Sequence, residues 1–205
     1  MNLRSGSFGA TMLLALVLAV PTKAQMGGQN TDRFELFGGY LRTSSVKGPQ
    51  GGSITSFPGQ NFIGFGLRAG SSYTDRWAVE FGFAYASTTQ LEVTVGLTTT
   101  QTDARFLIAD LSILHHFNPD SRFIVVLFAG PSWVQSRIEL SGTQQKDDHP
   151  ALHGGAALKT FTLPWETAYL RFDARFRYFS RAMEFDDHRR DLTGVEATFG
   201  LGVEF

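Results

Sequence analysis

The sequence predicts an all-β protein, specifically an eight-stranded antiparallel up-and-down transmembrane β-barrel. Three observations predict it: apolar residues recur at every second position, short and long connections alternate along the chain, and Trp and Tyr gather near the segment ends. Among the 205 residues, 13% are aromatic and only 18% are charged, so a disordered chain is excluded. A formal net charge of -1 gives no reason to expect a nucleic-acid partner.

Four segments alternate clearly between apolar and polar or small residues. They are residues 61–71, 77–87, 168–179 and 195–205. Four further segments alternate more weakly and are also expected to be strands, namely residues 34–42, 103–117, 122–135 and 152–161. Both faces of residues 124–128 are apolar, so the sequence leaves the facing of this strand open.

The connections between these segments alternate in length. Short turns are expected at residues 72–76, 118–121 and 162–167, and long polar loops at residues 43–60, 88–102, 136–151 and 180–192. This alternation is typical of outer-membrane barrels, which have short periplasmic turns and long external loops.

The N-terminus has the pattern of an export signal. Arg4 is the only charge before an apolar run from Met12 to Val20, and small residues precede a cleavage site before Gln25. We therefore expect a cleaved signal peptide over residues 1–24, a short segment over residues 25–33 and a barrel domain over residues 34–205. The absence of Cys removes disulfides and thiolate chemistry.

The polar face of the strands decides which face lines the interior. It carries charges interleaved with Gly and Ala, which leave room for long side chains inside a narrow eight-stranded barrel. We expect a lumenal charge network of Arg68, Glu80, Arg171, Asp173, Arg175, Glu196 and Glu204. Enclosed charges must be paired, and we expect Arg68, Arg171 and Arg175 to pair with Glu80, Asp173 and Glu196. The network would form a structural plug or, alternatively, line a gated narrow ion path.

Aromatic residues are expected to form two girdles at the membrane interfaces. They are Tyr40, Tyr73, Trp77, Tyr85, Trp133, Trp165, Tyr169 and Tyr178.

No catalytic, cofactor-binding or metal-binding residues are expected. The consecutive His115 and His116 point to opposite faces of a strand and cannot share a ligand. Residues 147–149 and 186–188 both read Asp-Asp-His and could bind a divalent cation, but solvated loop charge is the favoured interpretation.

The chain from about residue 34 to Phe205 resembles small outer-membrane barrel proteins of the OmpA-like and OmpX-like type. Three stretches carry the resemblance: Phe-Glu-Leu-Phe-Gly-Gly-Tyr at residues 34–40, Thr-Asp-Arg-Trp at residues 74–77, and Gly-Leu-Gly-Val-Glu-Phe at residues 200–205. The resemblance implies a monomer in the outer membrane of a Gram-negative bacterium, among lipid and lipopolysaccharide. It also implies that the terminal Phe205 is the signal read by the barrel assembly machinery. Nothing resembling a peptidoglycan-binding domain follows.

The function expected from these observations is a structural or surface-interaction role, without enzymatic activity. The alternatives are a narrow ion or small-solute pore, a lipid-modifying outer-membrane enzyme, and a soluble lipocalin-like carrier. The sequence leaves open what the surface loops bind and whether the lumen conducts.

Overall fold

The computed structural model describes residues 31–47, 54–57, 59–95, 98–140, 143–161, 167–185 and 188–205. No helix in these ranges is long and apolar enough to cross a membrane. The strands are β1 (Asp32–Thr43), β2 (Val46–Lys47), β3 (Ile54–Phe57), β4 (Asn61–Ser72), β5 (Trp77–Val95), β6 (Thr98–Phe117), β7 (Phe123–Leu140), β8 (Thr143–Phe161), β9 (Ala168–Phe185) and β10 (His188–Glu204).

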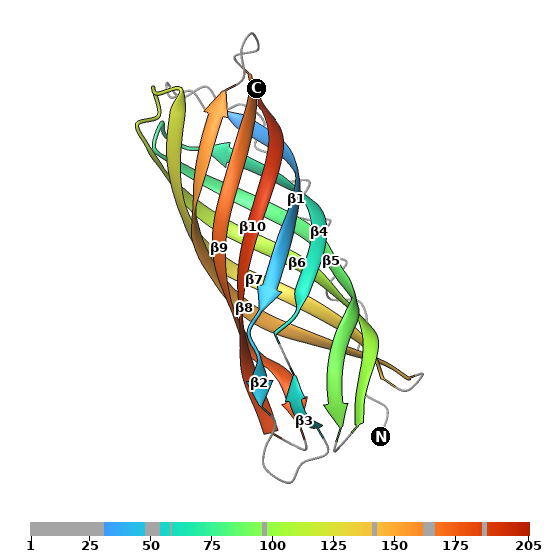
Figure 1. The fold of residues 1–205 in the computed structure, drawn as a ribbon. Helices are drawn as coiled ribbons and strands as arrows, with labels where there is room; N and C mark the ends of the chain where they lie inside the picture. Colours follow the sequence, from blue (N-terminus) through green and yellow to red (C-terminus); the bar gives the residue numbers. More distant parts are fainter. Residues whose placement is uncertain are drawn as a thin grey trace.

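Eight of these strands close into an antiparallel barrel, as predicted. Neighbours in sequence pair from β4 to β10, and β1 lies between β4 and β10. The closing ladder runs from Arg33 opposite Glu204 to Thr43 opposite Gly194. Figure 1 shows the strands tilted against the barrel axis, with the end of β10 at the rim opposite β2 and β3. The barrel therefore has no open edge along its body, because first and last strands pair over their length.

Two short turns at one rim have clear local causes. Between β4 and β5, the Thr74 hydroxyl accepts hydrogen bonds from the backbone N–H of Arg76 at 3.3 Å and of Trp77 at 3.0 Å. Between β6 and β7, Asn118 has a φ of 53°, a left-handed conformation that Asn tolerates better than most residues. The third expected turn, at residues 162–167, lies outside the described residues except for Thr167.

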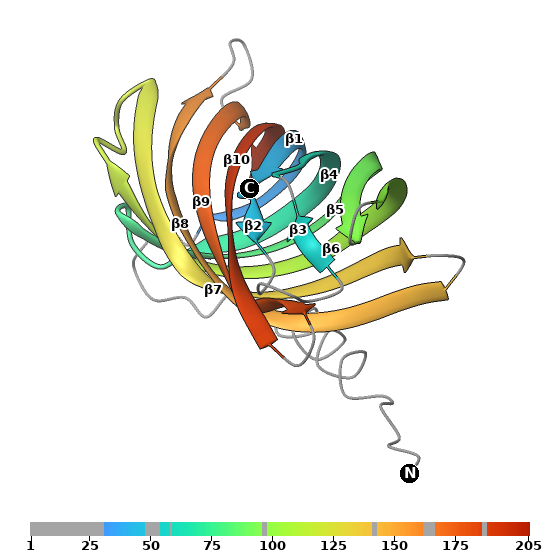
Figure 2. The same cartoon turned by 60° about the horizontal axis from the view of Figure 1, so that its bottom comes forward.

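At the other rim, the expected long loops are largely strands. Strand β5 continues to Val95 and β6 begins at Thr98, while β7–β8 and β9–β10 form hairpins of similar kind. The prediction of polar loops was wrong here because Thr-rich and mixed polar sequences can pair when both sides of a hairpin lie in water, where no apolar alternation is required. Figures 1 and 2 show these hairpins diverging from one another beyond the barrel body.

The strands β2 and β3 lie in the first of the expected long loops and extend the sheet. Ile54 of β3 lies opposite Val95 of β5, beyond the point where β4 begins. These two strands were not predicted, since each is at most four residues long.

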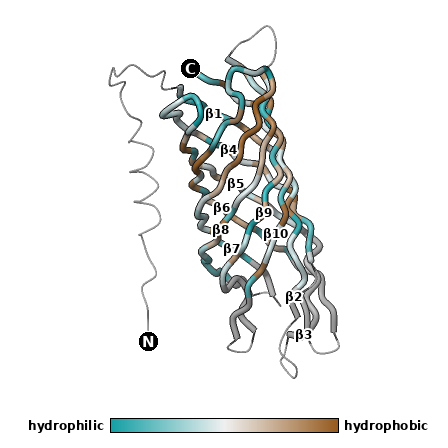
Figure 3. Tube along the Cα trace, turned by 90° about the vertical axis from the view of Figure 1, so that its left-hand side faces the viewer, coloured by the Kyte–Doolittle hydropathy of each residue, from teal (hydrophilic) through white to brown (hydrophobic). Residues whose placement is uncertain are grey.

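Alternation along the strands separates an inner from an outer face. Figure 3 shows hydrophilic and apolar residues interspersed along the barrel body. For the strand left open by the sequence, Ile124, Val126 and Phe128 are buried inside, whereas Val125 and Leu127 are exposed outside. The sequence could not decide this register because both faces of β7 are apolar.

Small residues on the inner face make room for large side chains. A Cβ atom at Gly200 would overlap the Glu35 carboxylate, and one at Gly202 would overlap the Tyr169 ring. Glycine at both positions thus allows β1 and β9 to project long side chains across the lumen.

A charged side chain on the outer face should lower the stability of the barrel more, the closer it lies to the bilayer midplane. Leu127 is 46% exposed and lies midway between Phe123 and Trp133 on the outer face of β7. We expect Leu127→Lys to lower the free energy of unfolding in lipid vesicles by about 2 to 4 kcal/mol, the cost of a cation near the bilayer midplane. The control Asn61→Lys, at the end of β4, should cost less than about 1 kcal/mol. Equal losses in urea titrations of the two variants would contradict a lipid-facing β7.

Candidate functional site

The inner face of β9 supplies four consecutive inward charges. Arg171, Asp173, Arg175 and Arg177 alternate with outward-facing Phe172, Ala174 and Phe176, and each of the four is at most 5% exposed. Period-two geometry places them in one line along the lumen. Because enclosed charge without a partner costs several kcal/mol, carboxylates from other strands must meet this line.

Arg68 of β4 joins three strands at the middle of the lumen. Its Nη1 donates hydrogen bonds to Glu35 of β1 and Asp173 of β9, both at 2.6 Å. Its Nη2 donates to the hydroxyl of Thr198 at 3.0 Å, and its guanidinium lies 3.9 Å from the centre of the Phe37 ring. Arg68 therefore links β1, β4, β9 and β10 through one planar group.

Arg171 makes the corresponding connection toward the short-turn rim. Its Nη1 donates to Glu80 of β5 at 2.7 Å, and its Nε and Nη2 lie 2.8 Å from Asp173 Oδ1. Glu80 also lies 3.5 Å from Arg33 and 3.9 Å from Arg68. The carboxylate of Glu80 is thus surrounded by three guanidinium groups.

A second group of charges centres on Asp110 of β6. Arg177 donates to Asp110 at 2.6 Å and 3.0 Å and to Glu196 at 2.9 Å, and Arg175 also donates to Asp110. The expected partner of Arg175 was Glu80, Asp173 or Glu196, but its short contact is with Asp110. Asp110 was not expected because its strand alternates weakly in sequence.

At the short-turn rim, Lys159 of β8 bonds to Glu204 of β10. The Lys159 ammonium also lies 4.2 Å from the centre of the Tyr169 ring. Arg33 Nη1 donates a hydrogen bond to His116 Nε2 at 3.3 Å. Glu204 therefore belongs to the rim rather than to the central groups.

The charges inside the described barrel balance. Six cations and six carboxylates line it: Arg33, Arg68, Lys159, Arg171, Arg175 and Arg177 against Glu35, Glu80, Asp110, Asp173, Glu196 and Glu204. We call this set the charge belt. Because the belt is neutral, the barrel does not have to enclose a net charge, which would be the largest electrostatic cost of burying so many ionised groups.

Apolar side chains bound the charge belt on the side of the long hairpins. Leu41, Phe62, Phe106, Phe179 and Leu192 are each at most 4% exposed and belong to one cluster. Phe106 lies between Phe62, at 4.7 Å between ring centres, and Phe179, at 6.2 Å. We call this cluster the apolar layer. It was not predicted from the sequence, because only the charged residues of the inner face were considered there.

A smaller apolar cluster lies toward the short turns, on the side of β5 to β8. It contains Ala78, Leu114, Ile124, Val126, Phe128 and Ala157. The rest of the lumen at this rim is occupied by Arg33 of β1, Lys159 of β8 and Tyr169 of β9. Side chains thus fill the interior over its described length, as expected for eight strands.

A serine and histidine group lies beside Asp110. His153 Nε2 is 2.8 Å from the Ser112 hydroxyl, and its Nδ1 is 2.7 Å from the Ser132 hydroxyl. Arg177 donates to the same Ser132 hydroxyl at 2.7 Å. Such a pair is found in hydrolases, but Ser112 is 2% and His153 is 5% exposed, so the arrangement serves as a hydrogen-bonded link between β6, β7, β8 and the belt.

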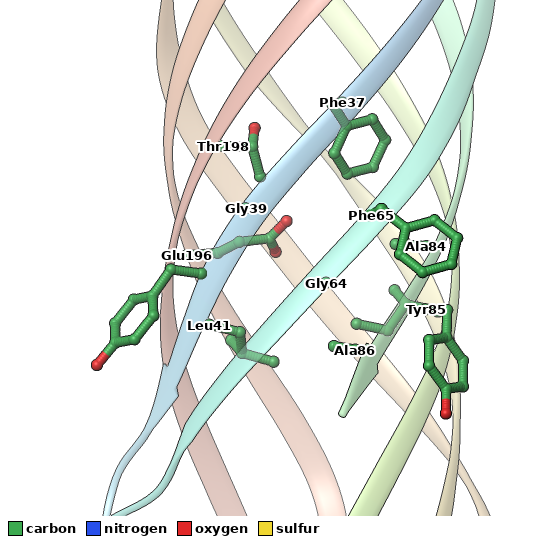
Figure 4. A pocket seen from close by; sticks show the side chains of 12 residues that line it. Phe37, Gly39, Leu41, Gly64, Phe65, Ala84, Tyr85, Ala86, Glu196 and Thr198 are labelled. Carbon is green, nitrogen blue, oxygen red and sulfur yellow. The ribbon is translucent and has the colours of Figure 1, made fainter. Parts of the chain in front are cut away.

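The hollow shown in Figure 4 lies in the wall between β1, β4 and β5. Gly39 and Gly64, which face each other across the ladder, are among its lining residues. Phe37, Leu41 and Glu196 are among its lining residues, and its volume is about 20 Å³. That volume is sufficient for about one water molecule, so this hollow does not hold an organic substrate.

No group of three or more His, Asp or Glu side chains in the described part of the chain could hold a metal ion. Of the two Asp-Asp-His stretches, His149 lies 3.7 Å from Asp147. The second stretch begins with Asp186 and Asp187, which lie outside the described residues.

Most of the expected aromatic residues face outward. Tyr40, Tyr73, Trp77, Trp133 and Tyr178 are 37% to 61% exposed, and Tyr85 is partly exposed on the outer face. The assignment of Tyr169 to a girdle was wrong, because its side chain is fully buried in the lumen on the same face as Arg171. Trp165 lies outside the described residues. Tyr85, Trp133 and Tyr178 lie within long strands and not at their ends, since those strands continue past the barrel body.

Sequence reasoning missed four members of the belt and left a fifth, Arg177, out of the expected network although alternation places it on the inward face. The four are Arg33, Glu35, Asp110 and Lys159. The sequence pattern could have identified two of them as inward, because Arg33 and Glu35 alternate with the outward-facing Phe34 and Leu36. For Asp110 and Lys159 the pairing partners are distant in sequence, so only the barrel register identifies them.

An apolar outer surface around a filled and neutral interior defines a small membrane-spanning β-barrel. Residues 10–205 match the family model described as outer membrane protein beta-barrel domain. The chain belongs to this family, and its location is the outer membrane. A sequence search of curated proteins finds no match.

Solved structures show the same fold. Neisserial surface protein A is 15% identical with a TM-score of 0.58, over 85% of this chain and 97% of that chain. Ail, the attachment invasion locus protein of Yersinia pestis, is 16% identical with a TM-score of 0.53, over 86% and 99%. The N-terminal barrel domain of Pseudomonas aeruginosa OprF is 17% identical with a TM-score of 0.53, over 87% and 99%. All three are outer-membrane barrel proteins and none is described as an enzyme.

The belt predicts a large stability effect of single charge removal. Glu80→Ala leaves Arg33 without its carboxylate and removes the hydrogen bond from Arg171 Nη1, and we expect the free energy of unfolding to fall by about 3 to 5 kcal/mol. Conductance of the variant in planar bilayers should stay at the level of the wild type, because the apolar layer remains. The control Asp75→Ala, on an exposed turn, should change stability by less than about 0.5 kcal/mol. Raised conductance with unchanged stability would instead identify Glu80 as part of an ion path.

Proposed function

We propose that this protein is a closed structural barrel of the outer membrane that presents hairpins for interaction at the cell surface. The observation that carries the proposal is the filled lumen, in which a neutral charge belt is covered by an apolar layer. The function then resides in what the barrel displays and not in what it transports.

A filled lumen opposes the alternative of a narrow pore. An ion moving through the belt would replace hydrogen bonds of 2.6 to 3.0 Å between guanidinium and carboxylate groups. It would then meet the apolar layer of Phe62, Phe106 and Phe179, which excludes water as hydrophobic constrictions do. Both barriers lie in series along the same axis.

The hairpins support the interaction role. In barrels of this type the long connections lie outside the cell and the short turns in the periplasm, which makes β5–β6, β7–β8 and β9–β10 external. The ladder between β8 and β9 stops at Ala151 opposite Phe179, although β8 begins at Thr143 and β9 continues to Phe185. Each external hairpin therefore presents strand edges, which are surfaces for pairing or side-chain contact.

The similar structures are consistent with this role. One is named a surface protein and another an attachment invasion locus protein, and a structure of the latter contains the heparin analogue sucrose octasulfate. At 15% to 16% identity these likenesses concern the fold. They make a sulfated polysaccharide a suitable first probe for the hairpins of this chain.

Export and assembly complete the proposal. Residues 1–24 would be removed as a signal peptide, and Phe205 would be read by the barrel assembly machinery. Phe205 is 74% exposed, and its backbone N–H donates to Asp32 at 2.9 Å. A monomer is proposed because the barrel closes on itself through β1 and β10.

The hairpins can be removed without cutting the barrel ladders. Replacing residues 89–103, 139–144 and 181–190 each by Asn-Gly, a sequence suited to two-residue hairpins that here joins residues in register, should leave heat-dependent gel mobility intact. Cells displaying the shortened protein should attach to heparin-coated beads at least about tenfold less than cells displaying the full chain, since a specific contact of ~1.4 kcal/mol is a factor of ten. Uncoated beads give the background. Equal attachment of the two strains above that background would contradict the role of the hairpins in binding this class of ligand.

A further inference from the structure

A row of three cations crosses the outer face of the external hairpins. Arg105 of β6 lies directly opposite Arg137 of β7, and Arg137 lies directly opposite Lys146 of β8. All three side chains are exposed and, by the alternation of their strands, point outward. We call these three residues the cation row.

Such a row is unfavourable without a partner. Residues directly opposite in an antiparallel ladder have Cβ atoms about 5 Å apart, and like charges at that spacing repel. Among the described residues, none of the three forms an ion pair with a carboxylate. The charges of the belt inside the barrel, in contrast, are all paired.

The central arginine is held in a fixed orientation. Gln135 Oε1 accepts hydrogen bonds from Arg137 Nε at 3.3 Å and Nη2 at 3.1 Å, and Gln135 Nε2 donates to Asp148 Oδ1 at 3.0 Å. Gln135 is only 7% exposed although it faces outward. The Nη1 group of Arg137 has no partner among the described residues and remains available to an anion.

Two carboxylates lie near the row and limit its field. Asp148 is two ladder positions closer to the membrane and already accepts the Gln135 hydrogen bond. Asp103 follows two residues further out on β6. Neither is within ion-pair distance of the row, so three positive charges remain for a ligand.

The height of the row matches the lipid headgroups. Trp133, 39% exposed on the outer face of β7, marks the external interface four residues before Arg137. Four residues at about 3.3 Å each, on a strand tilted by about 40°, place the row ~10 Å above Trp133. At that depth the anions in contact with a barrel are the phosphate groups of outer-leaflet glycolipid.

We propose that Arg105, Arg137 and Lys146 form a binding site for the phosphate groups of a glycolipid in the outer leaflet. Arg137, oriented by Gln135, binds one phosphate at the centre of the row, and Arg105 and Lys146 contact it or its neighbour from either side. The inference rests on the outer-membrane location of the barrel and not on what the hairpins contact.

The test uses the purified full-length chain and bisphosphorylated lipid A as the probe, with the same lipid lacking both phosphates for comparison. The variant is Arg105→Gln/Arg137→Gln. The matched control is Arg76→Gln/Arg122→Gln, which removes two exposed arginines at the opposite rim. Native mass spectrometry of the lipid adducts gives apparent Kd values, and heat-dependent gel mobility verifies folding of each variant.

We expect the double variant to bind bisphosphorylated lipid A at least about tenfold more weakly than the wild type, given about 1 kcal/mol per cation near a charged surface. The control should remain within twofold, and Lys146→Gln alone should weaken binding about fivefold. Lipid without phosphates should bind wild type and variant equally.

Three results would overturn the proposal. The first is unchanged binding of bisphosphorylated lipid A by the double variant. The second is an equal loss in the Arg76→Gln/Arg122→Gln control, which would assign the effect to net charge. The third is full competition by millimolar inorganic phosphate or by sucrose octasulfate, which would identify a site for free anions or sulfated sugars instead of a lipid.

Discussion

The charge belt is the constraint on which the rest of the structure depends. The twelve charged groups of the belt are enclosed by the barrel, and they are tolerable there only because each lies within ion-pair distance of a group of opposite charge. Arg68 and Arg177 each contact carboxylates from two other strands. Because these contacts cross the lumen, the belt ties opposite walls of the barrel together, at a diameter that follows from the number and stagger of the strands.

The apolar surfaces follow from the same arrangement. Once charges occupy the inner face, the outer face of each strand is left for bulky apolar residues that contact lipid, with Phe172 and Phe199 packed 4.7 Å apart across one ladder. The inner apolar layer of Phe62, Phe106 and Phe179 then covers the belt from the external side. Beyond that layer the strands lie in water, and their side chains are free to serve contacts such as those of the cation row.

Sequence reasoning predicted the barrel and part of its interior. Period-two alternation identified Arg171, Asp173 and Arg175 as inward because a strand offers only two faces. It failed for Tyr169, which was assigned to a girdle by residue type although its position shares the face of Arg171. Alternation also failed beyond the membrane, where residues 98–102 of β6, which read Thr-Thr-Thr-Gln-Thr, pair without an apolar face. The contacts of Asp110 and the alignment of Arg105, Arg137 and Lys146 depend on ladder register, which no local pattern specifies.

The central claim is that side chains fill and close the lumen, and measuring water access to the belt tests it most directly. The chain contains no Cys, so single cysteines can be placed at Thr198, which is buried in the belt at 6% exposure, and at Thr74, on an exposed turn. A cationic methanethiosulfonate reagent is then added to the folded protein in vesicles open to both sides. A filled and closed lumen predicts rapid labelling of Thr74→Cys and none of Thr198→Cys until the protein is unfolded. Labelling of Thr198→Cys at a comparable rate in the folded state would show a hydrated lumen and contradict the account.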